Sequence, residues 1–189
     1  MRIIVFLIAS LLAGHAAAQT APKPQYWAFK DWQVAVESFD TGEDFRVICR
    51  AWTGGDGDPT FGLEVSNGDV LPPDYYPAPT LSESAPRGHR TMMTDGAWIL
   101  FEADVLVDAD TPWRVDATAQ TWRDEEGFLQ ASASPASDGL DMLRIMRRAG
   151  KMWATMDGEV VYGASLSGFT AAYGKIAEQC GFPTTGVID

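Results

Sequence analysis

Short runs in which apolar and polar residues alternate fill most of the chain beyond its first 18 residues. Such alternation is typical of β-strands that bury one face. Runs at Trp32–Val36 and Phe45–Cys49 predict a hairpin, and the run at Phe61–Val65 predicts a third strand. Ala97–Val107 is the longest strand candidate, and Trp113–Ala117 follows it. The pattern therefore predicts a mainly β protein built from antiparallel strands.

A further hairpin is predicted near the end of the chain. The segments Met152–Met156 and Val160–Tyr162 are joined by Asp157 and Gly158. This dipeptide suits a two-residue turn in which both central residues take positive φ.

Two stretches in the C-terminal part have helical periodicity instead. The first is Asp138–Ala149, with acidic residues in its opening turn, arginines near its end and Leu140, Leu143 and Met146 as its apolar face. The second is Ser165–Cys180, whose large apolar residues share one narrow face: Leu166, Phe169, Tyr173, Ile176 and Cys180. Ser165 or Ser167 is the expected N-cap of this second helix, and Gly181 is its expected stop.

The first 18 residues have the features of a secretory signal peptide. Arg2 supplies a positive charge, Ile3–Leu12 is an apolar segment and Ala16–Ala18 provides a small-residue cleavage site. We expect cleavage after Ala18, export to the periplasm or cell surface, and a mature chain 19–189 that forms one domain with no transmembrane segment.

Only two cysteines, Cys49 and Cys180, are present in the chain. Cysteines of an exported protein usually pair, so we predict a structural disulfide between them; the alternative is two buried thiols. Their separation does not match a Cys-x-x-Cys redox motif.

The composition argues against several classes of function. The 189 residues carry 26 acidic and 14 basic side chains, a formal net charge of −12, which disfavours binding to nucleic acid. His89 is the single histidine after the leader, so a zinc protease or a histidine-rich metal site is not expected. The segment Gly54–Asp58 lacks the remaining ligands of a calcium loop. Neither a catalytic residue, a cofactor nor a metal is therefore expected.

Two surface features are candidates for binding. Tyr75 and Tyr76 lie in the proline-rich segment 71–86, which either stacks on a ligand or simply connects strands with one tyrosine folded down as a lid. A basic cluster is either an anion-binding surface or a complement to the helix dipole. Its members are Arg144, Arg147, Arg148 and Lys151.

Several segments of the chain resemble the invasion-associated locus B family of secreted bacterial proteins. The matching residues are Thr94–Trp98, Leu143–Gly150, Ser165–Tyr173 and Cys180, with weaker support from Asp31–Val34 and Cys49. The resemblance implies an immunoglobulin-like antiparallel β-sandwich with two helices near the C-terminus, in the periplasm or at the surface of a Gram-negative bacterium. It implies no catalytic residues. The N-terminal half, including segment 71–86, departs from the family pattern.

Export, the lack of recognisable catalytic motifs and the resemblance favour a non-enzymatic protein that acts through contacts with another protein or an envelope component, as in host interaction. The alternative hypothesis is a carbohydrate-binding or carbohydrate-cleaving module that uses exposed aromatic residues and a pair of carboxylates. The chain has seven tryptophans, and an exposed row of them would favour this alternative.

Overall fold

The computed structural model describes residues 23–189 except 41, 43, 56–58, 68–75 and 136–138. Its strands are β1 (Gln25–Phe29), β2 (Trp32–Asp40), β3 (Phe45–Gly54), β4 (Thr60–Ser66), β5 (Thr80–Ala85), β6 (Trp98–Asp108), β7 (Thr111–Arg123), β8 (Leu129–Pro135), β9 (Lys151–Met156) and β10 (Glu159–Ser165). Two helices, α1 (Gly139–Arg148) and α2 (Phe169–Cys180), lie in the C-terminal half. The prediction of a mainly β protein with antiparallel strands and two late helices is confirmed.

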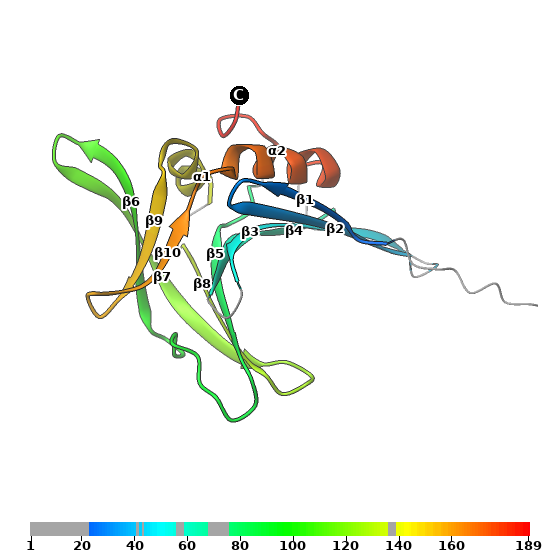
Figure 1. The fold of residues 1–189 in the computed structure, drawn as a ribbon, viewed down its shortest axis with the longest axis horizontal. Helices are drawn as coiled ribbons and strands as arrows, with labels where there is room; N and C mark the ends of the chain where they lie inside the picture. The colour runs from blue at the N-terminus through cyan, green and yellow to red at the C-terminus, as the bar shows by residue number, and fades with distance from the viewer. Residues whose placement is uncertain (1–22, 41, 43, 56–58, 68–75, 136–138) are drawn as a thin grey trace, which may run out of the picture.

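All ten described strands belong to one antiparallel sheet that is not closed (Figure 1). Their order is β1-β2-β3-β4-β5-β8-β7-β6-β9-β10. Residues opposite each other in an antiparallel pair point to the same face. Val36, Cys49 and Val65 form such a row across β2, β3 and β4, and all three are buried. We call this side, which carries the core and the helices, the inner face, and the opposite side the outer face.

The sheet curls around its inner face. Phe61 on β4 and Phe101 on β6 are four strand positions apart, which in a flat sheet would separate them by about 19 Å. Their ring centroids are only 5.8 Å apart. Farther along the sheet, the Tyr162 hydroxyl of β10 donates to the Thr53 carbonyl of β3 at 3.2 Å. The inner face therefore encloses a single core between two limbs of the same sheet.

Helix α2 covers the inner face of β1, β2 and β3 (Figure 1). The Trp32 ring meets Phe169 edge-on with centroids 5.2 Å apart, and Tyr173 lies between Phe169 and Phe182. Each large apolar residue of the predicted stripe is buried, as the periodicity required. The Trp32 indole N–H is also satisfied, because it donates to the Ser165 carbonyl at 2.9 Å.

The hairpin predictions are confirmed at both ends of the chain. β2 pairs with β3 in antiparallel register, and β9 pairs with β10. Asp157 and Gly158 join β9 to β10 with φ values of 53° and 85°, the positive values that a two-residue hairpin turn of this type requires. The longest strand is β7 and not β6, because the run that begins near Trp113 continues to Arg123.

The predicted start of α2 is wrong by four residues. Ser165 ends β10, and the helix begins at Phe169 after Gly168, whose φ is 104° and which makes no side-chain cap. Ser165 instead donates its hydroxyl hydrogen bond to the Asp31 carboxylate at 2.6 Å. The predicted stop is confirmed, since Gly181 has a left-handed conformation and its N–H donates to the Ala177 carbonyl.

Gly168 lies where the β1–β2 turn meets the junction between β10 and α2. A Cβ atom at this position would overlap the Phe29 carbonyl oxygen, so only glycine fits. Beside it, the Asp31 N–H donates to the Ser167 carbonyl at 3.2 Å. Two segments that carry the family resemblance, Asp31–Val34 and Ser165–Tyr173, thus meet in the fold as packing and capping positions.

Helix α1 buries Leu143 and Met146 as predicted, but its buried face is wider than the predicted one. Leu140 is half-buried, and the fully buried apolar residues are Met142, Leu143, Ile145 and Met146. The Trp113 indole N–H of β7 donates to the Asp141 carboxylate at 3.0 Å and holds the first turn. The other acidic residue predicted for that turn, Asp138, lies outside the described residues.

The Asp104 carboxylate of β6 accepts hydrogen bonds from the N–H groups of Gly150 and Lys151 at 2.8 and 3.1 Å. It therefore joins β6 to the connection between α1 and β9.

Candidate functional site

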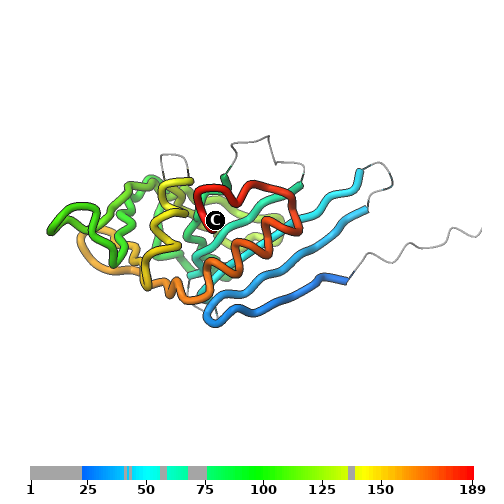
Figure 2. Tube along the Cα trace, turned by 90° about the horizontal axis from the view of Figure 1, so that it is seen from above, coloured from blue at the N-terminus to red at the C-terminus, as the bar shows by residue number. Residues whose placement is uncertain are grey.

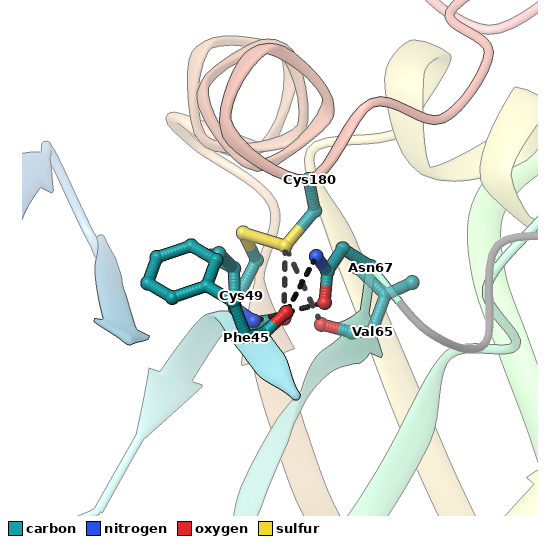
Figure 3. The surroundings of a disulfide bond; sticks show 6 residues. Phe45, Cys49, Val65, Asn67 and Cys180 are labelled. Carbon is teal, nitrogen blue, oxygen red and sulfur yellow. Dashed lines mark hydrogen bonds between the residues drawn. A yellow bond between two sulfur atoms is a disulfide. The ribbon is translucent and has the colours of Figure 1, made fainter. Parts of the chain in front are cut away.

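The predicted disulfide is present. Cys49 in the middle of β3 and Cys180, the last residue of α2, are bonded across a sequence separation of 131 residues, with Cα atoms 6.2 Å apart (Figure 3). Both residues are buried. The bond fastens the C-terminal end of α2 to the inner face of the sheet, and it indicates an extracytoplasmic protein.

The polar groups around the disulfide are backbone carbonyls. The Cys180 Sγ lies 3.6 Å from the carbonyl oxygens of Val47 and Val65 (Figure 3). A disulfide sulfur carries no proton, so these are contacts and not donated hydrogen bonds. Asn67 connects the same two strands, since its carboxamide oxygen accepts from the Val47 N–H at 2.9 Å. The surroundings are those of a structural link.

Three of the predicted binding residues contact the C-terminal segment of the chain. The Tyr76 hydroxyl donates to the Thr185 carbonyl at 2.8 Å, and Arg144 Nε donates to the Gly186 carbonyl at 3.2 Å. Arg147 donates to the Asp189 carbonyl at 2.9 Å. Figure 2 shows this segment lying beside α1. Tyr76 is half-buried, as expected for a tyrosine folded over a strand connection.

The remaining predicted binding residues are spread over different parts of the fold. Arg148 ends α1 and Lys151 begins β9, and both are exposed. Tyr75 lies outside the described residues, as does most of segment 71–86, whose last residues form β5. The use of these residues as a binding surface stays a prediction.

A larger candidate site lies on the outer face of the sheet, opposite the helices. Here the structure has a groove of about 680 Å³, a volume within the range of ligand-binding clefts. We call it the outer groove. The described residues that line it are Tyr26, Ala35, Glu37, Arg50, Ala51, Trp52, Thr60, Gly62, Leu63, Glu64, Ala78, Thr80, Ser82, Trp122 and Ser132.

Three aromatic side chains from three separate strands line the outer groove. Tyr26 on β1 is 66% exposed, Trp122 on β7 is 50% exposed, and Trp52 on β3 is half-buried. Trp52 is paired with Gly62 of β4. A Cβ atom at Gly62 would overlap the Ala51 carbonyl oxygen and lie 2.8 Å from the Trp52 Cβ. Glycine at this position therefore permits the close approach of β4 to β3 beside Trp52.

The charged residues of the outer groove form one ion-pair network. Arg50 Nε lies 2.6 Å from the Glu64 carboxylate, and Arg50 Nη1 lies 3.6 Å from Glu37. Burial by itself lowers the pKa of Arg50. The hydrogen bond to Glu64 and the negative charges of Glu64 and Glu37 together outweigh this effect, so the pKa of Arg50 lies above its ordinary value. The guanidinium is thus paired with acidic residues from both neighbouring strands, Glu37 of β2 and Glu64 of β4.

Hydroxyl groups occupy the centre of the outer groove. Ser82 of β5 lies directly between Thr60 of β4 and Ser132 of β8 in the strand register. Thr80 and Ser134 share a hydrogen bond of 2.8 Å in the next row. Ser82 and Ser132 have no side-chain hydrogen bond to the rest of the described chain, so they are available to a ligand.

Trp52 and Trp122 were not among the predicted site residues, although the sequence carries a signal for them. Each lies out of phase with the buried positions of its own strand, since Cys49 and Ala51 precede Trp52 at inward positions and Ala117 and Ala119 precede Trp122. A tryptophan at an outward position of an alternating strand is expected on the surface. Tyr26 belongs to a strand that the pattern did not reveal.

Within the described ranges, no three His, Cys, Asp or Glu side chains lie close enough together to share a metal ion. His89 is exposed in the loop after β5, as predicted. No described helix is long and apolar enough to cross a membrane.

No protein family model, curated protein or solved structure matches this chain.

Proposed function

We propose that this chain is a non-enzymatic protein of the periplasm or cell surface that acts by binding a component of the cell envelope in the outer groove. The observation that carries the proposal is the groove itself: three aromatic side chains and a row of hydroxyls exposed on the face that the helices leave open. Groups that are exposed together in a concave surface are typical of a binding site.

The location rests on two features. The signal-peptide pattern of residues 1–18, which lie outside the described residues, directs export, and the buried disulfide requires an oxidising compartment to form. These two independent features both indicate export from the cytoplasm.

The geometry of the carboxylates favours binding over hydrolysis. A glycosidase sets two carboxyl groups on either side of the scissile bond, one of them as a proton donor. In the outer groove, Glu37 and Glu64 instead hold the same guanidinium. This arrangement gives the groove shape and polarity without a free acid–base pair.

Membership of the invasion-associated locus B family is part of the proposal, together with its immunoglobulin-like arrangement and an origin in a Gram-negative bacterium. The contact between Phe61 and Phe101 across the core supports the arrangement, because it brings two limbs of the sheet face to face as in a sandwich. The meeting of Asp31–Val34 with the start of α2 supports the family. A role in host invasion is suggested by the family name alone, and an infection experiment is its test.

The test is capture from native envelopes by the mature chain, compared among variants. Trp52→Ala and Trp122→Ala remove aromatic surface from the outer groove. Trp98→Ala is the control, because Trp98 is 61% exposed on the same face but lies outside the groove lining. We expect the two groove variants to lose a captured component that the unsubstituted chain and Trp98→Ala both retain. Equal capture by all four chains would overturn the proposal.

A further inference from the structure

We propose that the ligand of the outer groove is an uncharged, extended glycan. This inference rests on the proposed function of the same groove and specifies the chemical class that it recognises. It is carried by the arrangement of three aromatic rings around the hydroxyls of Ser82 and Ser132, and by a described lining in which the one cation, Arg50, lies between two glutamates.

The aromatic rings suit the flat apolar faces of sugar rings. Trp52 lies near the C-terminal end of β3, while Tyr26 and Trp122 come from β1 and β7, so rings from three separate strands line the groove. Aromatic side chains combine a large apolar face with a polar edge, which suits a ligand whose rings have C–H faces and hydroxyl rims. Exposed rings held by a sheet also lose little conformational freedom on binding.

The hydroxyl row supplies the complementary polar contacts. Ser82 and Ser132 face the same way from neighbouring strands, and each hydroxyl both donates and accepts a hydrogen bond. Sugar hydroxyls have the same dual character. A row of such groups therefore matches a chain of sugars better than it matches a ligand with a fixed pattern of donors or acceptors.

The charges disfavour an anionic ligand. Of the described lining residues, Arg50 is the cationic one, and it is held by Glu37 and Glu64. The chain as a whole carries a formal net charge of −12. An acidic polysaccharide or a phosphate would have to displace two carboxylates from Arg50 against this field.

The strand pairing disfavours an extended peptide in the groove. A peptide that joins a sheet does so at a strand edge, where backbone N–H and C=O groups are unpaired. β3 is instead paired on both sides, with β2 and β4, where it forms the floor. Over the floor, recognition must therefore use side chains, as carbohydrate binding does; β1, which contributes Tyr26, is the edge strand at this end of the sheet.

The experiment is calorimetric titration of the mature protein with cellohexaose and with the hexamer of N-acetylglucosamine, as neutral probes, and with polygalacturonate as the anionic comparison. We expect at least one neutral hexamer to bind at one site and polygalacturonate to bind more weakly. Trp52→Ala and Trp122→Ala should each weaken binding by about tenfold, which corresponds to loss of about 1.4 kcal/mol. Ser82→Val should also weaken it, whereas Trp98→Ala should not.

The inference is overturned if neither neutral hexamer binds, if polygalacturonate binds more tightly than both, or if Trp98→Ala weakens binding as much as Trp52→Ala. Circular dichroism of each variant shows that it is folded. The envelope-capture experiment separates the two proposals: groove-dependent capture without hexamer binding would leave the groove with a protein or peptide ligand and remove the glycan. Loss of both results would remove the proposed function as well.

Discussion

At the scale of single residues, a few side chains and one glycine join segments that lie far apart in the sequence. Trp32 donates its indole N–H to Ser165, and Ser165 donates to Asp31, across more than 130 positions. Gly168 allows this junction, because its missing Cβ leaves space for the Phe29 carbonyl. These contacts give the segments that resemble a known family a structural role, because they join the β1–β2 turn to the start of α2.

Gly168→Ala is expected to destabilise the protein by about 3 kcal/mol or more, because it combines a strained positive φ with a backbone overlap. Gly181→Ala is the matched control at the other end of α2. Gly181 also has positive φ but has open space around its Cβ position, so it should cost only about 1–2 kcal/mol. Urea unfolding measures both values. Equal losses would show that the close approach to Phe29 does not matter.

Tyr173 makes the stability sensitive to high pH. Burial raises the pKa of its phenol above the ordinary value, with a smaller contribution from Tyr76. The unfolded chain therefore loses this proton above about pH 10 while the folded chain keeps it, so stability falls as the pH rises.

Tyr173→Phe removes this titration together with the hydrogen bond to the Pro183 carbonyl, which is worth about 1 kcal/mol. The variant should be less stable than the unsubstituted chain at pH 8. The difference should shrink or reverse at pH 11. Urea unfolding at the two pH values tests this, and a difference that stays constant would contradict the assigned burial effect.

At the scale of elements, alternation predicted the strands that have one strongly apolar side. β2, β4 and β6 bury mostly large apolar residues at every second position, whereas the β9–β10 hairpin also has the turn signal Asp157–Gly158. β5 and β8 were missed, because Leu81 is their one large, fully buried apolar residue and their outward positions are mostly small and polar, so the contrast is weak. β1 was missed because Tyr26 and Trp27 are aromatic on both faces. The sequence pattern could not predict the single curled sheet, because the pairing of β5 with β8 joins segments that are far apart along the chain.

We expect the Cys49–Cys180 disulfide to contribute strongly to the stability of the folded protein. Replacing both cysteines, as Cys49→Ala with Cys180→Ala, should lower the free energy of unfolding by up to about 5 kcal/mol. The reason is that the unfolded chain is then no longer closed into a long loop and gains conformational entropy. Denaturant unfolding of the variant, the oxidised chain and the reduced chain measures this. Unfolding of the oxidised and reduced chains at the same denaturant concentration would contradict a stabilising link.

At the scale of the whole molecule, the two faces of the sheet have different roles. The inner face is closed by α2, the disulfide and the C-terminal segment that Tyr76, Arg144 and Arg147 hold. The outer face has a groove with aromatic and hydroxyl side chains, in which Arg50 lies between Glu37 and Glu64. The binding surface predicted from the sequence lies partly against the C-terminal segment. The outer groove could not be predicted in this way, because its lining depends on the register between neighbouring strands.

The most direct test of a functional outer groove is site-specific photocrosslinking in native envelopes. The photoreactive residue p-benzoylphenylalanine replaces Trp122 in the groove or, for comparison, Arg148 at the exposed end of α1. We predict a covalent adduct from position 122 that is absent from position 148. An adduct from position 148 alone would contradict the assignment of function to the groove.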